Sequence, residues 1–252
     1  MRNLIYALLI GCFVVVLMGS AHAEGPRDIL FQVSMFNALD QGVQEVEFSV
    51  RELKRQGDFG IGTFNAIDGE MVVVDGDCFQ IKADGTALPA SESMRTPFAA
   101  VTFFDPDKVV ALGEFENYAA VKEQLDKELP TKNIFHAIKI TGTFKYIRSR
   151  SIPPQEPPYP SLNKVFETQT VSEFRNVRCT LVGFYGPTYI KGINVPGYHF
   201  HFVTEDRKAG GHVMECRLEK GVAEIDFTSQ FHMALPESNA FYKAERLDEW
   251  PF

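Results

Sequence analysis

A proline-rich run divides the chain near its middle. Between Arg150 and Leu162 the sequence reads Ser-Ile-Pro-Pro-Gln-Glu-Pro-Pro-Tyr-Pro-Ser. Prolines lack a backbone N–H and fix φ, so this run excludes a regular helix or central strand and favours an extended connection. We therefore predict a connection over 151–161 that separates an N-terminal half, 24–150, from a C-terminal half, 162–252.

Both halves are predicted to consist mainly of strands, with few helices. Segments rich in β-branched and aromatic residues, punctuated by Asp-Gly pairs, predict strands at 63–67, 70–74, 79–81, 98–104 and 134–147. Helical periodicity is confined to 43–56, 118–129 and 162–174. Each half has a helix followed by several strands, which indicates an α+β fold with mixed sheets. This order also suggests a duplicated unit, although the internal identity is weak.

The first residues have the layout of a secretory signal peptide. Arg2 precedes an apolar run over 4–18, and small residues then end in Ala21-His22-Ala23. We expect cleavage after Ala23, which gives a periplasmic or extracellular protein that begins at Glu24. An uncleaved anchor is the alternative, because the run is close to the lower limit of about 17 residues for a membrane span. No second run is long and apolar enough, so we expect no membrane association after cleavage.

Charge and cysteine content exclude several classes of protein. The formal net charge is −8, and removal of Arg2 makes the mature chain more negative still. An acidic chain without a Lys/Arg run is a poor nucleic-acid binder, and an anionic substrate would need a local positive centre. The mature chain keeps three cysteines, which allow at most one internal disulfide and include no CxxC zinc motif: Cys78, Cys179 and Cys216.

A cluster of histidines predicts a metal site. His199 and His201 are two residues apart, so in a strand they point to one face while Phe200 and Phe202 fill the other. The polar run 204–208 and two flexible glycines, 210–211, predict a hairpin connection. His212 would then open the returning strand, opposite His201.

Three histidines leave the fourth zinc position open, as in catalytic rather than structural zinc sites. His136 and His232 are isolated in the sequence and are not expected to be ligands. A cupin-like site is an alternative, in which Glu205 would be a ligand and His212 idle. The glycines of the cupin motif are absent, because Ile193 and His212 occupy their positions.

The mature chain resembles the acetolactate decarboxylase family along nearly its whole length. The matching segments are Gly57-Asp-Phe-Gly-Ile-Gly-Thr-Phe64, Asp68-Gly-Glu70, Val73-Val-Asp-Gly76, Phe144-Lys-Tyr-Ile-Arg-Ser-Arg-Ser-Ile-Pro153, Leu181-Val-Gly-Phe-Tyr-Gly-Pro-Thr-Tyr189, Gly192-Ile-Asn-Val-Pro-Gly-Tyr-His-Phe-His-Phe202 and Gly210-Gly-His212. The resemblance implies a duplicated β-α-β4 unit and an enzyme that decarboxylates 2-acetolactate to acetoin. It also implies zinc as the cofactor and a small anionic substrate. The sequence does not determine the oligomeric state, and a homodimer is one candidate assembly.

The resemblance also assigns site residues. His199, His201 and His212 match the family's zinc ligands, and polar residues at its active site match Thr63, Glu70 and Arg150. The family uses a further glutamate from its C-terminal tail, for which Glu237 and Glu249 are the candidates here.

These residues form a coherent reaction centre. Zinc would act as a Lewis acid on the hydroxyl and ketone oxygens of the substrate. Arg150 would hold its carboxylate, Glu70 would relay a proton and Thr63 would donate a hydroxyl. Without the resemblance, the local sequence would predict a surface ion-pair residue at Arg150 and a solvent-facing turn residue at Glu70. A zinc hydrolase and a non-catalytic periplasmic binding module are the competing functions.

Overall fold

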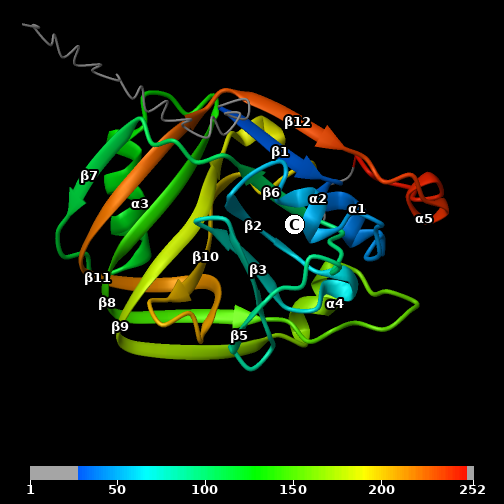
Figure 1. The fold of residues 1–252 in the computed structure, drawn as a ribbon, viewed down its shortest axis with the longest axis horizontal. Coiled ribbons are helices and arrows are strands. Elements are labelled where there is room, and N and C mark those ends of the chain that lie inside the picture. The colour runs from blue at the N-terminus through cyan, green and yellow to red at the C-terminus, as the bar shows by residue number, and fades with distance from the viewer. Residues whose placement is uncertain (1–27, 249–252) are drawn as a thin grey trace, which may run out of the picture.

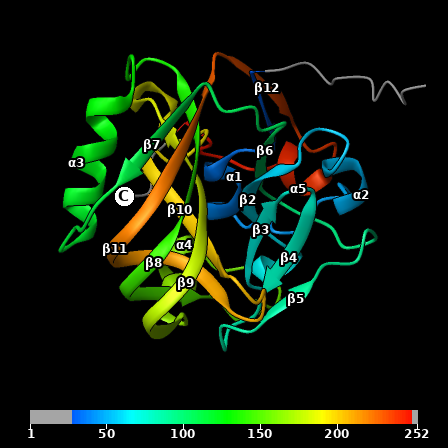
Figure 2. The same cartoon turned by 60° about the vertical axis from the view of Figure 1, so that its left-hand side comes forward.

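Two β-sheets pack against each other to form the frame of the molecule (Figures 1 and 2). The computed structural model describes residues 28–248, so the predicted signal peptide, its cleavage site and Glu249 lie outside the described residues. The first sheet has seven strands in the order β12-β1-β6-β2-β3-β4-β5. They are β1 (Ile29–Val33), β2 (Phe59–Thr63), β3 (Glu70–Val74), β4 (Asp77–Ile81), β5 (Ala87–Pro89), β6 (Ala99–Thr102) and β12 (Gln230–Ala234). This sheet is mixed, because β1 and β12 pair in parallel and the other neighbours are antiparallel.

The second sheet has five antiparallel strands in the order β10-β9-β8-β11-β7. They are β7 (Lys108–Leu112), β8 (Phe135–Ser151), β9 (Thr170–Gly186), β10 (Gly197–Thr204) and β11 (Gly210–Thr228). β10 also pairs with the start of β11 through His201 and His212. The sheet therefore curls until its β10 edge meets β11, which brings residues from β8, β10 and β11 together.

The helices are short and lie outside the sheets. They are α1 (Phe36–Asp40), α2 (Val50–Leu53), α3 (Tyr118–Glu128), α4 (Leu162–Glu167) and α5 (Asn239–Tyr242), with single 3-10 turns η1 (Asn65–Ile67) and η2 (Thr188–Ile190). The prediction of an α+β fold with few helices is confirmed. The helix expected over 43–56 is wrong except for α2, which a Ser49–Glu52 capping box starts. The helix expected over 162–174 ends early, because residues from Thr170 onward pair with β8.

Three main hydrophobic clusters fill the spaces between these layers. On the outer side of the five-stranded sheet, Val121 and Leu125 of α3 are fully buried. Between the sheets, Phe59 and Val72 pack in one cluster with Phe184. The third cluster lies where α1 and α2 cover the remaining face of the seven-stranded sheet. The site described below lies at the edge of the space between the sheets.

The proline-rich connection is free of helix and strand over residues 152–161, and it joins β8 to α4. The strands of each sheet come from both sides of it. β7 and β8 precede it but belong to the five-stranded sheet, whereas β12 follows it and belongs to the seven-stranded sheet. The two predicted halves thus exchange strands, and the division into halves stays a prediction.

The described cysteines form no disulfide. Cys78, Cys179 and Cys216 are all buried free thiols, so the single bridge that their number allows is not formed. Burial raises the pKa of the Cys78 and Cys216 thiols to about 12. Among residues 28–248, no helix is long and apolar enough to span a membrane.

Candidate active site

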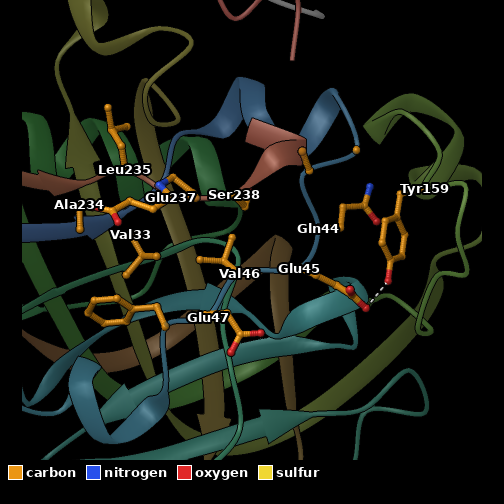
Figure 3. A pocket seen from close by; sticks show the side chains of 14 residues that line it. Val33, Gln44, Glu45, Val46, Glu47, Tyr159, Ala234, Leu235, Glu237 and Ser238 are labelled. Atoms are coloured by element: carbon orange, nitrogen blue, oxygen red, sulfur yellow. Dashed lines mark hydrogen bonds between the residues drawn. The ribbon is translucent and has the colours of Figure 1, made fainter. Parts of the chain in front are cut away.

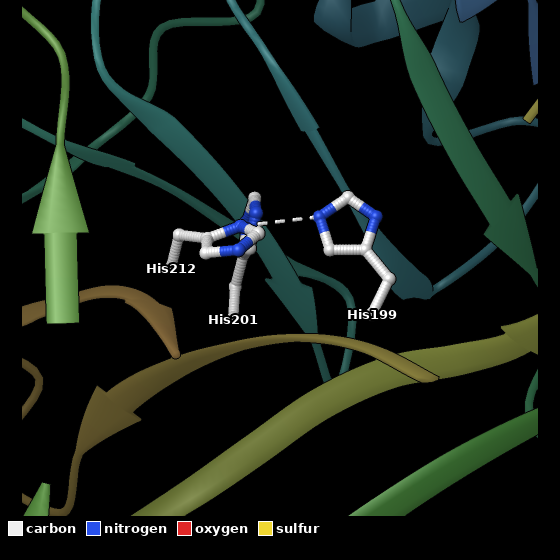
Figure 4. A group of neighbouring side chains, drawn as sticks. All are labelled: His199, His201 and His212. Atoms are coloured by element: carbon white, nitrogen blue, oxygen red, sulfur yellow. Dashed lines mark hydrogen bonds between the residues drawn. The ribbon is translucent and has the colours of Figure 1, made fainter. Parts of the chain in front are cut away.

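Three imidazoles converge where β10 meets β11 (Figure 4). His199 and His201 project from one face of β10, and Phe200 and Phe202 are buried in the core on the other face, as the strand period predicts. His212 lies directly opposite His201 in the register. One ligand atom from each ring lies within 4.8 Å of the others, and His199 Nε2 is 3.2 Å from His212 Nδ1. The predicted three-histidine cluster is confirmed as a group that can hold a metal ion.

The glycines that precede His212 serve a different purpose from the one predicted. Gly210 and Gly211 belong to β11, and the turn lies before them, over 205–209. At Gly210 a Cβ would clash with the backbone carbonyl oxygen of Phe202, and at Gly211 it would lie 2.9 Å from the carbonyl oxygen of Arg150. Both glycines are therefore required because the backbones of neighbouring strands approach closely, and not because the connection must be flexible.

The environment of the histidines keeps them neutral, as metal ligands must be. His201 Nδ1 lies 2.8 Å from the Met71 carbonyl oxygen, which can only accept, so Nδ1 carries the proton and Nε2 has the free lone pair. Burial lowers the pKa of His201 to about 4. Burial, together with neighbouring positive charge, holds the pKa of His199 and of His212 well below the usual value. A tripod of neutral nitrogens suits zinc, so the residues present fit the predicted metal.

Glu70 lies beside this cluster. It opens β3, opposite Thr63 of β2, and its Oε2 is 3.3 Å from His201 Nε2. The side chain is buried, so the interpretation of Glu70 as a solvent-facing turn residue is wrong. Burial raises its pKa to about 7, and Arg150 opposes the shift. A carboxyl group with this pKa can hold or release a proton near neutral pH.

Arg150 lies near the end of β8, opposite His212 of β11. Its guanidinium contacts Phe166 and Gln169, and its Nε is buried. Burial lowers the pKa of Arg150 below its usual value, and the nearby Glu70 carboxylate partly opposes this shift. It is therefore no surface ion-pair residue but a cation enclosed within the site.

Thr63 lines the same cavity, but its hydroxyl is engaged. Thr63 Oγ1 donates to the Gly69 carbonyl oxygen at 2.7 Å. In this arrangement the oxygen can accept a hydrogen bond, whereas its proton is not free for a substrate. Contact of Thr63 with substrate stays a prediction.

The site opens into a small cavity of about 60 Å³ with a largely apolar wall. The three histidines, Thr63, Glu70 and Arg150 supply its polar side, and the apolar lining consists of Phe36, Leu39, Gly62, Ile67, Phe98, Ile152, Leu162 and Phe166. No local sequence pattern indicates this wall, because its residues come from α1, β2, η1, α4 and the positions just before β6 and just after β8. Ile67 has φ of +50°, which is unusual for a β-branched residue. Backbone strain of this kind clusters at functional sites.

The other candidate residues lie elsewhere. Glu205 is exposed and pairs with Arg178 at 3.0 Å, so the cupin-like ligand set is wrong. His136 is buried against the Thr131 carbonyl, and His232 is exposed on β12, so neither joins the cluster. Glu237 lines a larger, separate hollow between residues 42–48 and the segment that leads into α5 (Figure 3).

The fold and site define a class of protein: an α+β protein with three histidines that can hold a metal ion, an adjacent acid and a partly buried cation around an apolar cavity. Comparison with known proteins gives the family. Residues 30–248 match the family model described as alpha-acetolactate decarboxylase. The chain belongs to this family, and the prediction of a carboxy-lyase is confirmed.

Individual relatives agree over most of their length. The alpha-acetolactate decarboxylase of Methanosarcina mazei is 50% identical over 223 residues, which cover 88% of this chain and 77% of the relative. That of Methylococcus capsulatus is 44% identical over 225 residues, covering 89% and 86%. The crystal structure of the Bacillus subtilis protein superposes with a TM-score of 0.85 at 38% identity, covering 88% of this chain and 94% of that one.

Proposed function

We propose that this protein is a zinc-dependent acetolactate decarboxylase that converts 2-acetolactate to acetoin and CO₂. One observation supports the metal dependence above all others: three neutral histidines converge on one cavity, which a buried carboxyl group and a partly buried guanidinium also border. His199, His201 and His212 would hold the zinc. When bound, the metal would supply Lewis acidity toward the hydroxyl and ketone oxygens of the substrate.

Arg150 is proposed to bind the substrate carboxylate. Decarboxylation moves the electron pair of the breaking C–C bond into the adjacent ketone, so that bond must stand parallel to the carbonyl π system. A planar guanidinium fixes a carboxylate at two points and thereby fixes its plane. Arg150 of β8 lies opposite His212 of the neighbouring strand β11, which puts its charge next to the histidines.

Glu70 is proposed to move the proton that the reaction requires. Loss of CO₂ leaves an electron pair on carbon, and acetoin forms when a proton is added there. The Glu70 carboxyl is buried, has a pKa of about 7 and lies 3.3 Å from His201 Nε2. It can therefore hold a proton beside the reacting atoms at neutral pH.

The apolar wall is proposed to receive the two methyl groups of the substrate and to exclude water. Phe36, Leu39 and Phe98 lie on this side of the cavity. Exclusion of water strengthens the interactions of Arg150 and Glu70 with the substrate, because the local dielectric constant falls.

The test is an acetoin assay on purified protein with 2-acetolactate, together with zinc analysis. We expect acetoin and CO₂ in equal amounts, loss of activity with a chelator, and recovery when zinc is restored. Zinc-dependent cleavage of esters or amides without CO₂ release would favour a hydrolase. Binding of acetolactate without turnover would favour a non-catalytic binding module.

We also propose that the protein is exported and that the mature chain begins at Glu24, from the Ala21-His22-Ala23 site that follows the apolar run. Mass spectrometry of the protein recovered outside the cytoplasm should find Glu24 as the first residue. Recovery of the chain with residues 1–23 intact would contradict the proposal.

A further inference from the structure

Two residues from outside its strand contact the guanidinium of Arg150. The Arg150 Cζ lies 4.1 Å from the centroid of the Phe166 ring, on α4. Arg150 Nη1 donates to Gln169 Oε1 at 3.3 Å, just before β9 begins. A ring against one face fixes the plane of the guanidinium, and a bond to one terminal nitrogen fixes its rotation in that plane.

These two contacts leave one end of the guanidinium for a ligand. Arg150 Nε is buried and has no acceptor among residues 28–248, and within the same range the Nη1 donor is engaged by Gln169. No protein acceptor for Nη2 occurs in this described part of the chain, and Arg150 borders the cavity that holds the histidines. The edge formed by Nε and Nη2 is therefore the part of Arg150 that can offer two donors to a bound anion.

The segment that carries Phe166 is itself firmly held. Leu162 and Val165 of α4 pack in a cluster with Leu39 and Ile152, and the Leu162 backbone N–H donates to Asp40 Oδ1 at 3.0 Å. Phe166 is partly buried and packs against the same cluster, so its backbone is anchored where its ring contacts Arg150. Thr168 Oγ1 donates to the Val165 carbonyl at 2.7 Å, which holds the turn that leads to Gln169.

We propose that Phe166 and Gln169 are positioning residues that direct Arg150 toward the carboxylate of the substrate. The proposal rests on the proposed function, because it assumes that Arg150 binds that carboxylate. Neither residue needs to touch the substrate: both act through the guanidinium. A misplacement of about 1 Å in a binding group can lower a rate by about a hundredfold, so a loosened Arg150 should be measurable.

The experiment compares Phe166→Leu, Phe166→Tyr and Gln169→Leu in the zinc-loaded enzyme, each with Arg150 intact and with Arg150→Lys. We expect Phe166→Leu and Gln169→Leu each to lower kcat/KM for acetolactate about tenfold, with zinc content unchanged. Phe166→Tyr keeps the aromatic face and should retain most activity. In protein that already carries Arg150→Lys, Phe166→Leu and Gln169→Leu should each lower kcat/KM by less than about twofold, because the guanidinium that they position is gone.

Two further measurements separate positioning from a general structural effect. Inhibition by acetoin, which lacks the carboxylate, should be the same in all variants, whereas binding of the carboxylate-bearing substrate should weaken. Tyr146→Leu is the matched control, because the Tyr146 ring contacts two arginines away from the cavity. Its centroid lies 5.3 Å from Arg175 Cζ and 5.7 Å from Arg217 Cζ. Its kinetics should equal those of the unmodified enzyme.

The outcomes are distinct. If Phe166→Leu and Gln169→Leu have full activity while Arg150→Lys is impaired, the positioning proposal is overturned and the role of Arg150 stands. Equal losses with and without Arg150→Lys would also overturn it, because the residues would then act independently of Arg150. Full activity of Arg150→Lys would overturn both the carboxylate contact and the positioning. Should Phe166→Leu fail to fold, Gln169→Leu, which leaves the aromatic contact in place, still decides the question.

Discussion

Gly183 is predicted to set the distance between β9 and the strand that carries two of the three histidines. It lies opposite Phe200 on β10 and Ile138 on β8. In Gly183→Ala the new Cβ would lie 2.6 Å from Phe200 Cδ1 and 2.9 Å from Phe200 Cα, and closer still to the His199 carbonyl oxygen. Real Cβ atoms essentially never approach within 3.0 Å, and backbone atoms cannot turn aside. β10 must therefore move away from β9 and take its imidazoles with it.

The expected size of the effect follows from this geometry. Overpacking of a well-filled region costs about 1–3 kcal/mol of unfolding free energy. Displaced ligands should weaken zinc binding by about ten- to a hundredfold, the range seen when the support of a metal ligand is removed. The measurements are denaturant unfolding of the metal-free protein and zinc competition with a chromogenic chelator. Gly113→Ala is the control: its Cβ would meet nothing within 4 Å, so both quantities should be unchanged. Unchanged zinc affinity in Gly183→Ala would refute the reasoning.

Three further predictions concern single side chains. Arg150→Lys keeps the positive charge but loses the planar guanidinium that holds a carboxylate at two points. We therefore expect kcat/KM for acetolactate to fall about thirtyfold to a thousandfold, with full zinc content. Unaltered kinetics would rule out the contact between Arg150 and the substrate carboxylate. Glu70→Gln removes the titrating group, while the Met71 carbonyl still orients His201. Turnover of acetolactate should therefore fall about a hundredfold or more, with zinc retained. A rate close to that of the unmodified enzyme would exclude Glu70 as the proton donor. Burial, with like charges nearby, raises the pKa of Asp226 from 3.8 to about 7. Because the folded protein then holds this proton more tightly than the unfolded chain, stability should fall as the pH rises from about 4 to about 7, and Asp226→Asn should restore about 2–4 kcal/mol at pH 8 but little at pH 4 in unfolding titrations. Equal effects of that change at both pH values would contradict the assignment.

The local pattern of the sequence predicted that the three histidines converge. The alternation of His199, Phe200 and His201 determines which side chains face the site, because a strand has a strict period of two residues. The pairing of His201 with His212 followed from a short hairpin, so no long-range information was needed. The family resemblance supplied Glu70 and Arg150, whose local surroundings alone suggested exposed positions.

The features that the sequence did not reveal depend on contacts between distant segments. β1 pairs with β12 across about two hundred residues, and neither strand has a local signal for that partner. Arg150 is partly covered by Phe166, which follows the proline-rich connection and returns to the cavity on α4. The helix expected over 43–56 failed because Val46 instead exchanges hydrogen bonds with the side chain of Asn65. In each case tertiary contacts override local propensity.

The central claim is that the three-histidine group holds the zinc on which decarboxylation depends. The most direct test measures zinc content and acetoin formation in His212→Ala, with His232→Ala as the control, because His232 is an exposed histidine on β12. His212→Ala should retain little zinc and form no acetoin above background, while His232→Ala should match the unmodified enzyme in both measurements. Full zinc occupancy and normal acetoin formation in His212→Ala would contradict the account.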